Sequence, residues 1–227
     1  MKKGKLAIVV SSLPIAAFLA ITAAAPLSAG TITIMSDATN VGASLTTSGE
    51  TPSAAENLLL STGNTSGLTF TPVGTDNLGS FTAPPSGSPA GTIPVQVPPE
   101  CGYYCGQSGF VEKTFTLPAG VTSASLTGAG NVDDLGYAFL NGNLISGLLT
   151  EFGNVTFSTS DLAYFQSGVN TFMIADSNSG GGPSAVAYYA DIDYSTAATP
   201  EPSTWLLFGS GLAGFAGMIR RKIVLHT

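Results

Sequence analysis

The sequence predicts an all-β protein, an antiparallel β-sandwich, between two apolar ends. From Gly109 onward, short segments alternate between apolar and polar residues, and turn signals recur about every ten residues. No long amphipathic helix pattern occurs outside the ends, where most apolar runs are concentrated. A chain of 227 residues has room for one domain of ordinary size plus targeting segments. We therefore expect the sandwich domain at residues 30–199.

Charge excludes several classes of function for this domain. Between residues 30 and 202, Lys113 is the only basic side chain against all 14 acidic ones, which gives a formal charge of −13. So acidic a body repels phosphate backbones, and we expect no binding to nucleic acid. The sole histidine, His226, lies beyond the apolar tail, so His-dependent triads and His-ligated zinc are excluded from the body. We expect no enzyme; chemistry based on a pair of carboxylates is the alternative that the residues leave open.

Residues 1–29 have the layout of a secretory signal peptide. A basic start is followed by an apolar stretch from Leu6 to Ala25 and then by small residues. A cut after Ala25 would place Pro26 directly past the cleaved bond, which is unfavourable for a residue with a fixed φ and no N–H. We therefore expect signal peptidase to cut between Ala29 and Gly30. An uncleaved anchor helix is the alternative.

Residues 203–219 form an uncharged, mostly apolar run followed by the basic cluster Arg220, Arg221 and Lys222. As a helix this run would span roughly 25 Å, slightly short of a bilayer core of about 30 Å. Snorkelling of the basic side chains could extend it. We expect a transmembrane helix at 203–219 with the basic cluster on the cytoplasmic side; a buried core helix is the alternative.

The segment 200–227 resembles the PEP-CTERM sorting signal of exported proteins of Gram-negative bacteria. The resemblance rests on Pro200, Glu201 and Pro202, on the Gly-rich apolar run, and on Arg220-Arg221. It implies recognition by exosortase, a membrane-embedded cysteine transpeptidase that removes the tail near the motif. It also implies a membrane-anchored precursor, and then a protein of the cell surface or extracellular matrix associated with exopolysaccharide. The prolines should hold Glu201 in an extended, accessible segment.

Residues 30–110 carry weaker signals. Short strands are expected at Thr31–Met35 and Leu68–Val73, and residues 45–110 are expected to be loop-rich, even partly disordered. The Pro/Gly-rich stretch from Thr82 predicts a long surface loop, with a flexible linker as the alternative. In an exported protein, Cys101 and Cys105 favour a local disulfide that pins this loop; two free or metal-binding thiols are the alternative.

From Gly109 the strand pattern is clear. Tyr137–Leu140 and Leu144-Ile145 flank the turn dipeptide Asn141-Gly142, which predicts a hairpin. A short helical turn should begin at Ser160 or Asp161. In the last strand, alternate residues place one apolar set on one face, with Asp191, Asp193 and Tyr189 on the other. The apolar set is Val186, Tyr188, Ala190, Ile192 and Tyr194.

This region also resembles the galactose-binding-like jelly roll of many carbohydrate-binding and surface domains. The resemblance rests on Asp133 or Asp134 before the strand that ends in Leu140-Asn141-Gly142, and on Leu162 with the later segment Gly168-Val169-Asn170-Thr171. It implies the fold more than a ligand.

Two sets of side chains are candidate binding residues. Asp133, Asp134, Asp191 and Asp193 could bind a structural Ca²⁺, a cation that prefers oxygen ligands; solvated acids are the alternative. Tyr103, Tyr104, Tyr188 and Tyr189 could stack on sugar rings; burial in the core is the alternative.

The sequence as a whole therefore predicts an exported structural or adhesive protein of an exopolysaccharide-rich biofilm or floc. The alternative is a carbohydrate-binding module that recognises the matrix exopolysaccharide. No other cofactor is expected.

Overall fold

The computed structural model describes residues 28–47, 49–75, 82–97, 106–151, 153–179, 184–197 and 202–224. The chain divides into two compact units, and Leu27–Ala198 form the larger one. The other unit comprises the two ends of the chain, of which only the helix at 202–224 is described.

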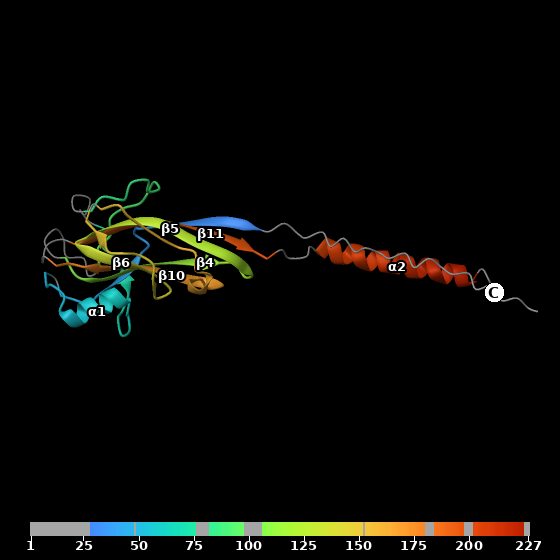
Figure 1. Ribbon diagram of the computed structural model, residues 1–227, viewed down its shortest axis with the longest axis horizontal. Coiled ribbons are helices and arrows are strands. Elements are labelled where there is room, and N and C mark those ends of the chain that lie inside the picture. Colours follow the sequence, from blue (N-terminus) through green and yellow to red (C-terminus); the bar gives the residue numbers. More distant parts are fainter. Residues whose placement is uncertain are drawn as a thin grey trace, which may run out of the picture. The chain divides into compact units, whose positions relative to one another are not determined.

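One face of the larger unit is a four-stranded antiparallel sheet with the strand order β1-β11-β5-β9. Its two longest strands, β5 and β11, pair along nearly their whole length (Figure 1). The strands are β1 (Ala29–Met35), β5 (Val121–Asp133), β9 (Val155–Thr159) and β11 (Ala185–Thr196).

The second sheet lies against the first and has the order β3-β2-β4-β10-β6-β7, with β8 paired to β6. All its pairings are antiparallel, so the expected β-sandwich is confirmed. Its strands are β2 (Val41–Ser44), β3 (Thr71–Pro72), β4 (Gly109–Leu117), β6 (Leu135–Leu140), β7 (Asn143–Leu144), β8 (Leu149–Thr150) and β10 (Gly168–Ser177).

The main hydrophobic core lies between the two sheets, because alternate residues of each strand point inward. Phe172 of β10 lies in this core, its ring centroid 5.5 Å from that of Phe157 and 5.0 Å from that of Tyr188. The apolar set expected on one face of β11 belongs to this core, with Tyr194 at its margin. That set is Val186, Tyr188, Ala190, Ile192 and Tyr194.

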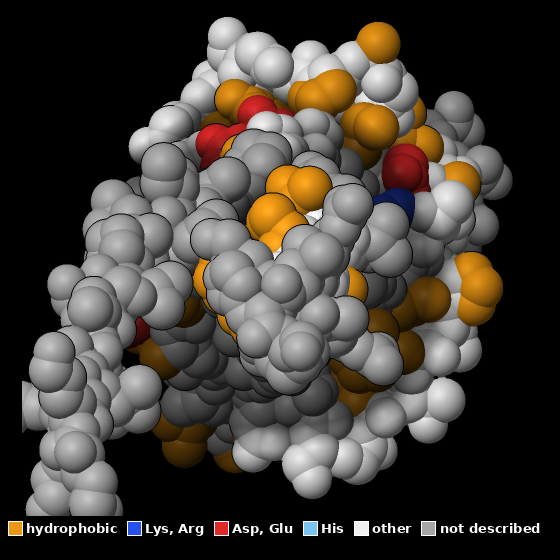
Figure 2. Space-filling view, turned by 90° about the vertical axis from the view of Figure 1, so that its right-hand side faces the viewer, with side chains coloured by type: hydrophobic (Ala, Val, Ile, Leu, Met, Phe, Trp, Pro, Cys, Tyr) orange, Lys and Arg blue, Asp and Glu red, His pale blue; other side chains and the backbone are white. Residues whose placement is uncertain are grey.

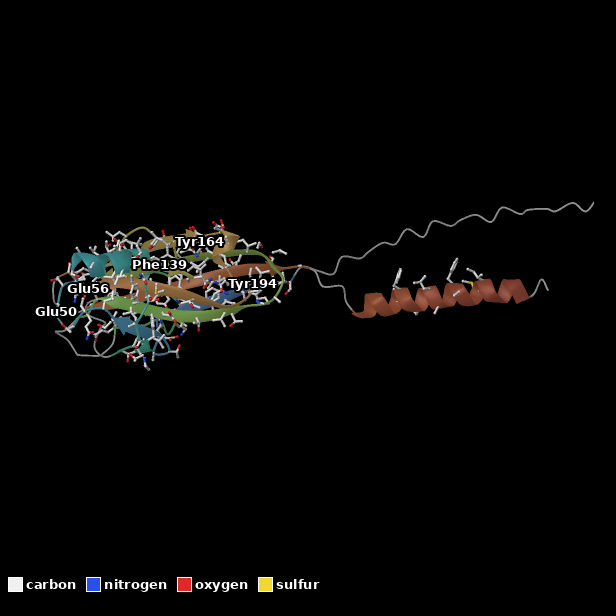
Figure 3. All side chains as sticks on the ribbon, turned by 90° about the horizontal axis from the view of Figure 1, so that it is seen from below. Glu50, Glu56, Phe139, Tyr164 and Tyr194 are labelled. Atoms are coloured by element: carbon white, nitrogen blue, oxygen red, sulfur yellow. The ribbon has the colours of Figure 1, made fainter. Side chains whose placement is uncertain are left out.

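A helix that the sequence patterns did not predict covers the outer face of the second sheet. Helix α1 (Ala54–Thr62) buries Leu60 against Phe139, labelled in Figure 3, and against other side chains of β4, β6 and β10. These strands are therefore buried on both faces. The helix begins with a capping box, in which the Ser53 side chain accepts a hydrogen bond from the Glu56 N–H and the Glu56 side chain accepts one from the Ser53 N–H.

The segment before the cysteines is not a surface loop throughout. Val95 and Val97 are fully buried in the main core, and Val95 forms an isolated antiparallel bridge with Val186 of β11. The expectation of a surface loop is therefore wrong for these residues, because the side chains of Val95 and Val97 pack into the core beside β11 although prolines flank them. The strand expected at Leu68–Val73 is reduced to the two residues of β3.

The predicted local structures between β6 and β10 are confirmed. Asn141 and Gly142 have positive φ angles of 49° and 78°, as a tight hairpin turn between β6 and β7 requires. A 3₁₀ turn, η2 (Leu162–Tyr164), follows, and the side chain of its N-cap residue Asp161 accepts a hydrogen bond from the Ala163 N–H.

The acidic character of the larger unit persists on its surface. On the face shown in Figure 2, basic colour among the described side chains is confined to one small area beside an acidic side chain. The only salt bridge among the described residues joins Lys113 to Asp37, with 2.8 Å between Nζ and Oδ1.

Candidate functional site

The proposed sorting segment contains helix α2 (Pro202–Val224), which extends past the expected end at residue 219 and through the basic cluster 220–222. Pro202 is its first residue, a position where the missing N–H has no intrahelical partner. Pro200 and Glu201 lie outside the described residues, as do the side chains of Arg220, Arg221 and Lys222.

The described side chains of α2, residues 207–219, are all exposed. A methyl group added at any of the four glycines of this stretch would have no heavy atom within 4 Å. The large apolar side chains exposed in the same stretch are those of Leu207, Phe208, Leu212, Phe215, Met218 and Ile219. No helix in the described part of the chain meets the usual length and hydropathy requirements for crossing a membrane. The helix is therefore confirmed, and the transmembrane assignment is not.

Three acidic side chains gather at one end of the sandwich. Asp133 ends β5, Asp134 follows it, and Glu151 follows β8, which pairs with the start of β6. One carboxylate oxygen from each lies within 4.8 Å of the others. Burial, together with the nearby charges of Glu151 and Asp134, raises the pKa of Asp133 to about 7. Sequence reasoning selected Asp133 and Asp134 but missed Glu151, which no local motif connects to them.

A fourth acid, Asp176 of β10, lies behind this cluster and is fully buried. The Ser184 hydroxyl contacts Asp176 Oδ2 and is 3.0 Å from the backbone carbonyl oxygen of Asp133. The other carboxylate oxygen, Oδ1, is buried and has no hydrogen-bond partner among the described residues. Burial raises the pKa of Asp176 well above its usual range, and the charges of Asp133 and Asp134 act in the same direction.

Asp191 and Asp193, the other two candidate calcium ligands, lie elsewhere. Asp133 pairs with Ala185 at one end of β11, whereas Asp191 is six residues further along that strand. This spacing corresponds to roughly 20 Å in a strand. The carboxylate of Asp191 accepts a hydrogen bond of 2.6 Å from the Thr33 hydroxyl, and Asp193 accepts one from Thr31. The sequence pattern therefore joined two acidic pairs that the fold separates.

The tyrosines divide between core and surface. Tyr188 is fully buried and contacts Phe172, so it cannot stack on a sugar ring. Its neighbour Tyr189 points to the other face and is half-buried. Tyr103 and Tyr104 lie outside the described residues, as do Cys101 and Cys105. The expected disulfide and the stacking role of the Tyr103-Tyr104 pair remain predictions.

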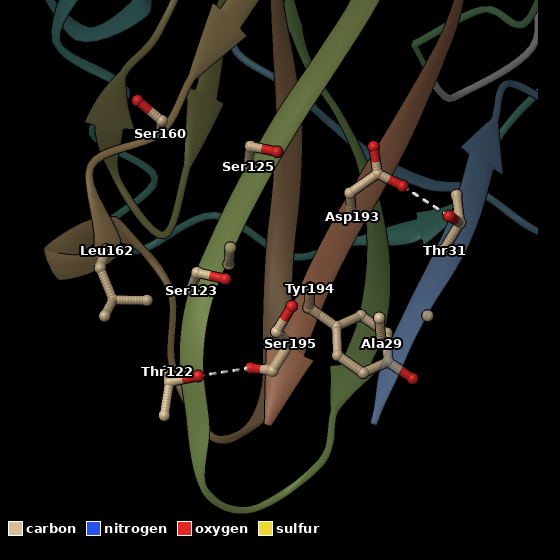
Figure 4. A pocket seen from close by; sticks show the side chains of 12 residues that line it. Ala29, Thr31, Thr122, Ser123, Ser125, Ser160, Leu162, Asp193, Tyr194 and Ser195 are labelled. Carbon is tan, nitrogen blue, oxygen red and sulfur yellow. Dashed lines mark hydrogen bonds between the residues drawn. The ribbon is translucent and has the colours of Figure 1, made fainter. Parts of the chain in front are cut away.

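A hollow of about 690 Å³ lies on the four-stranded sheet, near the start of β1 and the end of β11 (Figure 4). Seven of its twelve lining residues carry hydroxyl groups. Asp193 accepts the bond from Thr31 on one side, and the Thr122 hydroxyl donates to the Ser195 carbonyl on the other. The hydroxyl-bearing residues are Thr31, Thr122, Ser123, Ser125, Ser160, Tyr194 and Ser195.

The expected cleavage site lies at the start of β1. Ala29 pairs with Ser195 of β11, and the Ser28 carbonyl accepts a 2.8 Å hydrogen bond from the Thr196 N–H. A cut between Ala29 and Gly30 would remove these contacts and leave the rest of β1 paired. The site remains a prediction, because residues 1–27 lie outside the described part.

An acidic β-sandwich followed by a proline-flanked motif, an apolar helix and a basic cluster defines an exported protein with a C-terminal sorting segment. The family model of the PEP-CTERM protein-sorting motif matches residues 198–222. The chain therefore carries a PEP-CTERM sorting signal, which implies export and processing by exosortase.

Comparisons with curated proteins and with solved structures identify no functional relative. A search of curated proteins finds no match. Among solved structures, the Ruminococcus gnavus β-glucuronidase matches at 13% identity and a TM-score of 0.40, over 72% of this chain and 29% of that one. A β-glucuronidase of an uncultured Clostridium species matches at 11% identity and a TM-score of 0.36, over 74% and 29% of the two chains. The chain thus spans under a third of either enzyme, and the likeness supports no functional argument.

Proposed function

We propose that this protein is a structural or adhesive component of an exopolysaccharide-rich matrix, such as a biofilm or floc, on the outside of a Gram-negative cell. The observation that carries the proposal is the sorting motif at residues 198–222. A protein with this motif is exported and processed, and its body then acts outside the cell or on its surface.

Before processing, the precursor is anchored in the membrane through α2. The exposed large apolar side chains along 207–219 support this step, because such a continuous surface is unfavourable in water. The apolar run carries no charged residue until Arg220. Within a bilayer the helical backbone satisfies its own hydrogen bonds, so the glycines of α2 are tolerated there.

The body acts without catalysis. A histidine base is excluded by the sequence, and the one basic side chain between residues 30 and 202, Lys113, is paired with Asp37. The clustered acids Asp133, Asp134 and Glu151 are not among the residues that line the hollow of Figure 4. A rigid acidic sandwich suits a matrix component that hydrates and spaces polymer chains.

The second candidate function is a carbohydrate-binding module, favoured by the hydroxyl-rich hollow of Figure 4. Hydroxyl groups there can donate to and accept from sugar hydroxyls, and Tyr194 offers a half-buried aromatic edge. Binding of the purified full-length chain to a glycan array distinguishes the two functions. Binding to a specific glycan that is abolished by Ser123→Val and Ser125→Val supports the carbohydrate-binding module. If the chain binds no glycan specifically, the structural role is supported.

The sorting step is tested in the native host with Glu201→Ala and with the double variant Arg220→Gln/Arg221→Gln. We expect both chains to stay in the membrane fraction at the precursor mass, because the first removes the recognised charge and the second removes the basic cluster. Glu50→Ala is the matched control, since it removes an exposed acid of the body. Variants that reach the surface at the mature mass would show that the motif does not direct sorting.

A further inference from the structure

The end of the sandwich where β5 passes into β6 gathers acidic groups from separate parts of the chain. Asp133 and Asp134 connect β5 to β6, and Glu151 follows β8, whose Thr150 pairs with Leu135 of β6. Asp176 of β10 pairs with Gly136 in the same region. The sheet register therefore brings these carboxylates together, although their positions in the sequence are far apart.

The spacing of the carboxylate oxygens fits one bound ion. Oxygens from Asp133, Asp134 and Glu151 lie within 4.8 Å of one another. Two oxygens that bind the same Ca²⁺ at about 2.3–2.6 Å can be at most about 5 Å apart. The Ser179 N–H and hydroxyl both donate to Asp134 Oδ2, at 2.8 and 2.9 Å, and so orient that carboxylate.

A second observation, independent of this spacing, points to a bound cation. Asp176 is fully buried, and no described residue forms a hydrogen bond with its Oδ1. A buried carboxylate oxygen without a partner is strongly destabilising unless a cation or proton compensates it. Asp176 adjoins the cluster, because the Ser184 hydroxyl contacts Asp176 Oδ2 and lies 3.0 Å from the backbone carbonyl oxygen of Asp133.

The described part of residues 30–202 supplies no compensating base. Lys113 is the only basic side chain between residues 30 and 202, and its Nζ already bonds to both carboxylate oxygens of Asp37, at 2.8 and 3.0 Å. The acids of the cluster differ in burial, since Asp133 is buried and Glu151 is exposed to solvent. An ion can therefore approach from the Glu151 side.

We propose that Asp133, Asp134 and Glu151 bind a Ca²⁺ ion at this end of the sandwich, with the buried carboxylate of Asp176 adding negative charge behind them. Carboxylate oxygens are the ligands that this hard cation prefers, and water can complete its coordination on the exposed side. Extracellular calcium modules bind with dissociation constants of about 10⁻⁴–10⁻³ M, a range that suits an exported protein. The ion would crosslink the β5–β6 connection, through Asp133 and Asp134, to the end of β8, through Glu151.

The test is thermal melting of the purified full-length chain in detergent, after treatment with EDTA, with and without calcium chloride at constant ionic strength. In calcium at about 10 mM, well above that range of dissociation constants, we expect the melting temperature to rise by about 3–10 °C, because the ion binds only the folded chain. The double variant Asp134→Asn/Glu151→Gln should lose this rise. Asp191→Asn/Asp193→Asn removes the same number of acids elsewhere and should keep it.

Several results would overturn the proposal. If calcium does not raise the melting temperature of the wild type, these carboxylates bind no Ca²⁺. The same follows if calcium raises the melting temperature of Asp134→Asn/Glu151→Gln as much as that of the wild type. A larger shift with magnesium than with calcium excludes calcium as the occupant. Stabilisation on acidification without any calcium response shows that the acids share protons instead. Asp176→Asn should respond more weakly to calcium than the wild type, and an unchanged response removes Asp176 from the site.

Discussion

Lys113 of β4 forms an ion pair with Asp37, which follows β1, and thereby joins the two sheets of the sandwich. Its Nζ lies 2.8 and 3.0 Å from the two carboxylate oxygens, and the Thr39 hydroxyl donates to the same carboxylate at 2.6 Å. Both charged side chains are largely covered, with 18% of Lys113 and 26% of Asp37 exposed. The only basic residue of the body is thus used for structure.

Replacement of Lys113 by methionine should lower the free energy of unfolding by about 1–2 kcal/mol, because Asp37 loses a charged hydrogen-bond donor while the apolar stem is kept. Urea unfolding of the single variants and of the double variant with Asp37→Asn measures the coupling. If the effects of the two substitutions simply add, the ion pair contributes nothing to stability.

The same pair predicts a pH dependence. Burial acts to raise the pKa of Asp37, but hydrogen bonds from Lys113 and Thr39 outweigh it and lower that pKa below its usual value. The pKa of Asp37 in the folded chain is therefore below its value in the unfolded chain, which is about 4. The stability that the ion pair contributes is full above that pH and is lost as the pH falls. The stability difference between wild type and Lys113→Met should shrink as the pH falls from about 6 to about 3. A constant difference would contradict this.

Gly63, the C-cap of α1, should tolerate no side chain. Its φ is +66°, and a methyl group there would lie 2.8 Å from the Phe139 ring. We expect Gly63→Ala to cost about 2–4 kcal/mol, from the unfavourable φ and the clash together. Gly67 is the matched control, because its φ is +82° but its surroundings are open. Gly67→Ala should cost only about 1 kcal/mol in the same urea experiment; equal losses would mean that Phe139 moves aside freely.

Gly128 of β5 has no room for a side chain, because Tyr189 and Phe157 pack closely against it. A methyl group there would lie 2.2 Å from the Tyr189 carbonyl oxygen and 2.7 Å from the Phe157 ring. Because the first of these atoms belongs to the backbone of a central strand, Gly128→Ala should cost more than about 3 kcal/mol or prevent folding. Gly147→Ala, at an open position, should leave the urea midpoint nearly unchanged. Similar yields and midpoints for both variants would contradict the close approach.

Local patterns predicted the central strands well. The Asn141-Gly142 turn and the inward face of β11 follow from residue chemistry and from the two-residue period of a strand, and the structure confirms both. Helix α1 was missed although Ser53 and Glu56 have the spacing of a capping box, because α1 is short and its apolar residues form one run. The burial of Val95 had no local signal, since it depends on space beside β11.

The sequence by itself determined the class of fold and the sorting signal, because strand alternation is a local property and the PEP-CTERM motif is one continuous segment. Only the tertiary structure decided which acids lie together. Asp133, Glu151 and Asp176 are distant in the chain, and the register of β5, β6, β8 and β10 makes them neighbours. The pairing of β5 with β11 places Asp133 opposite Ala185, six residues from Asp191, because pairing fixes position along the strand as well as the face of each side chain.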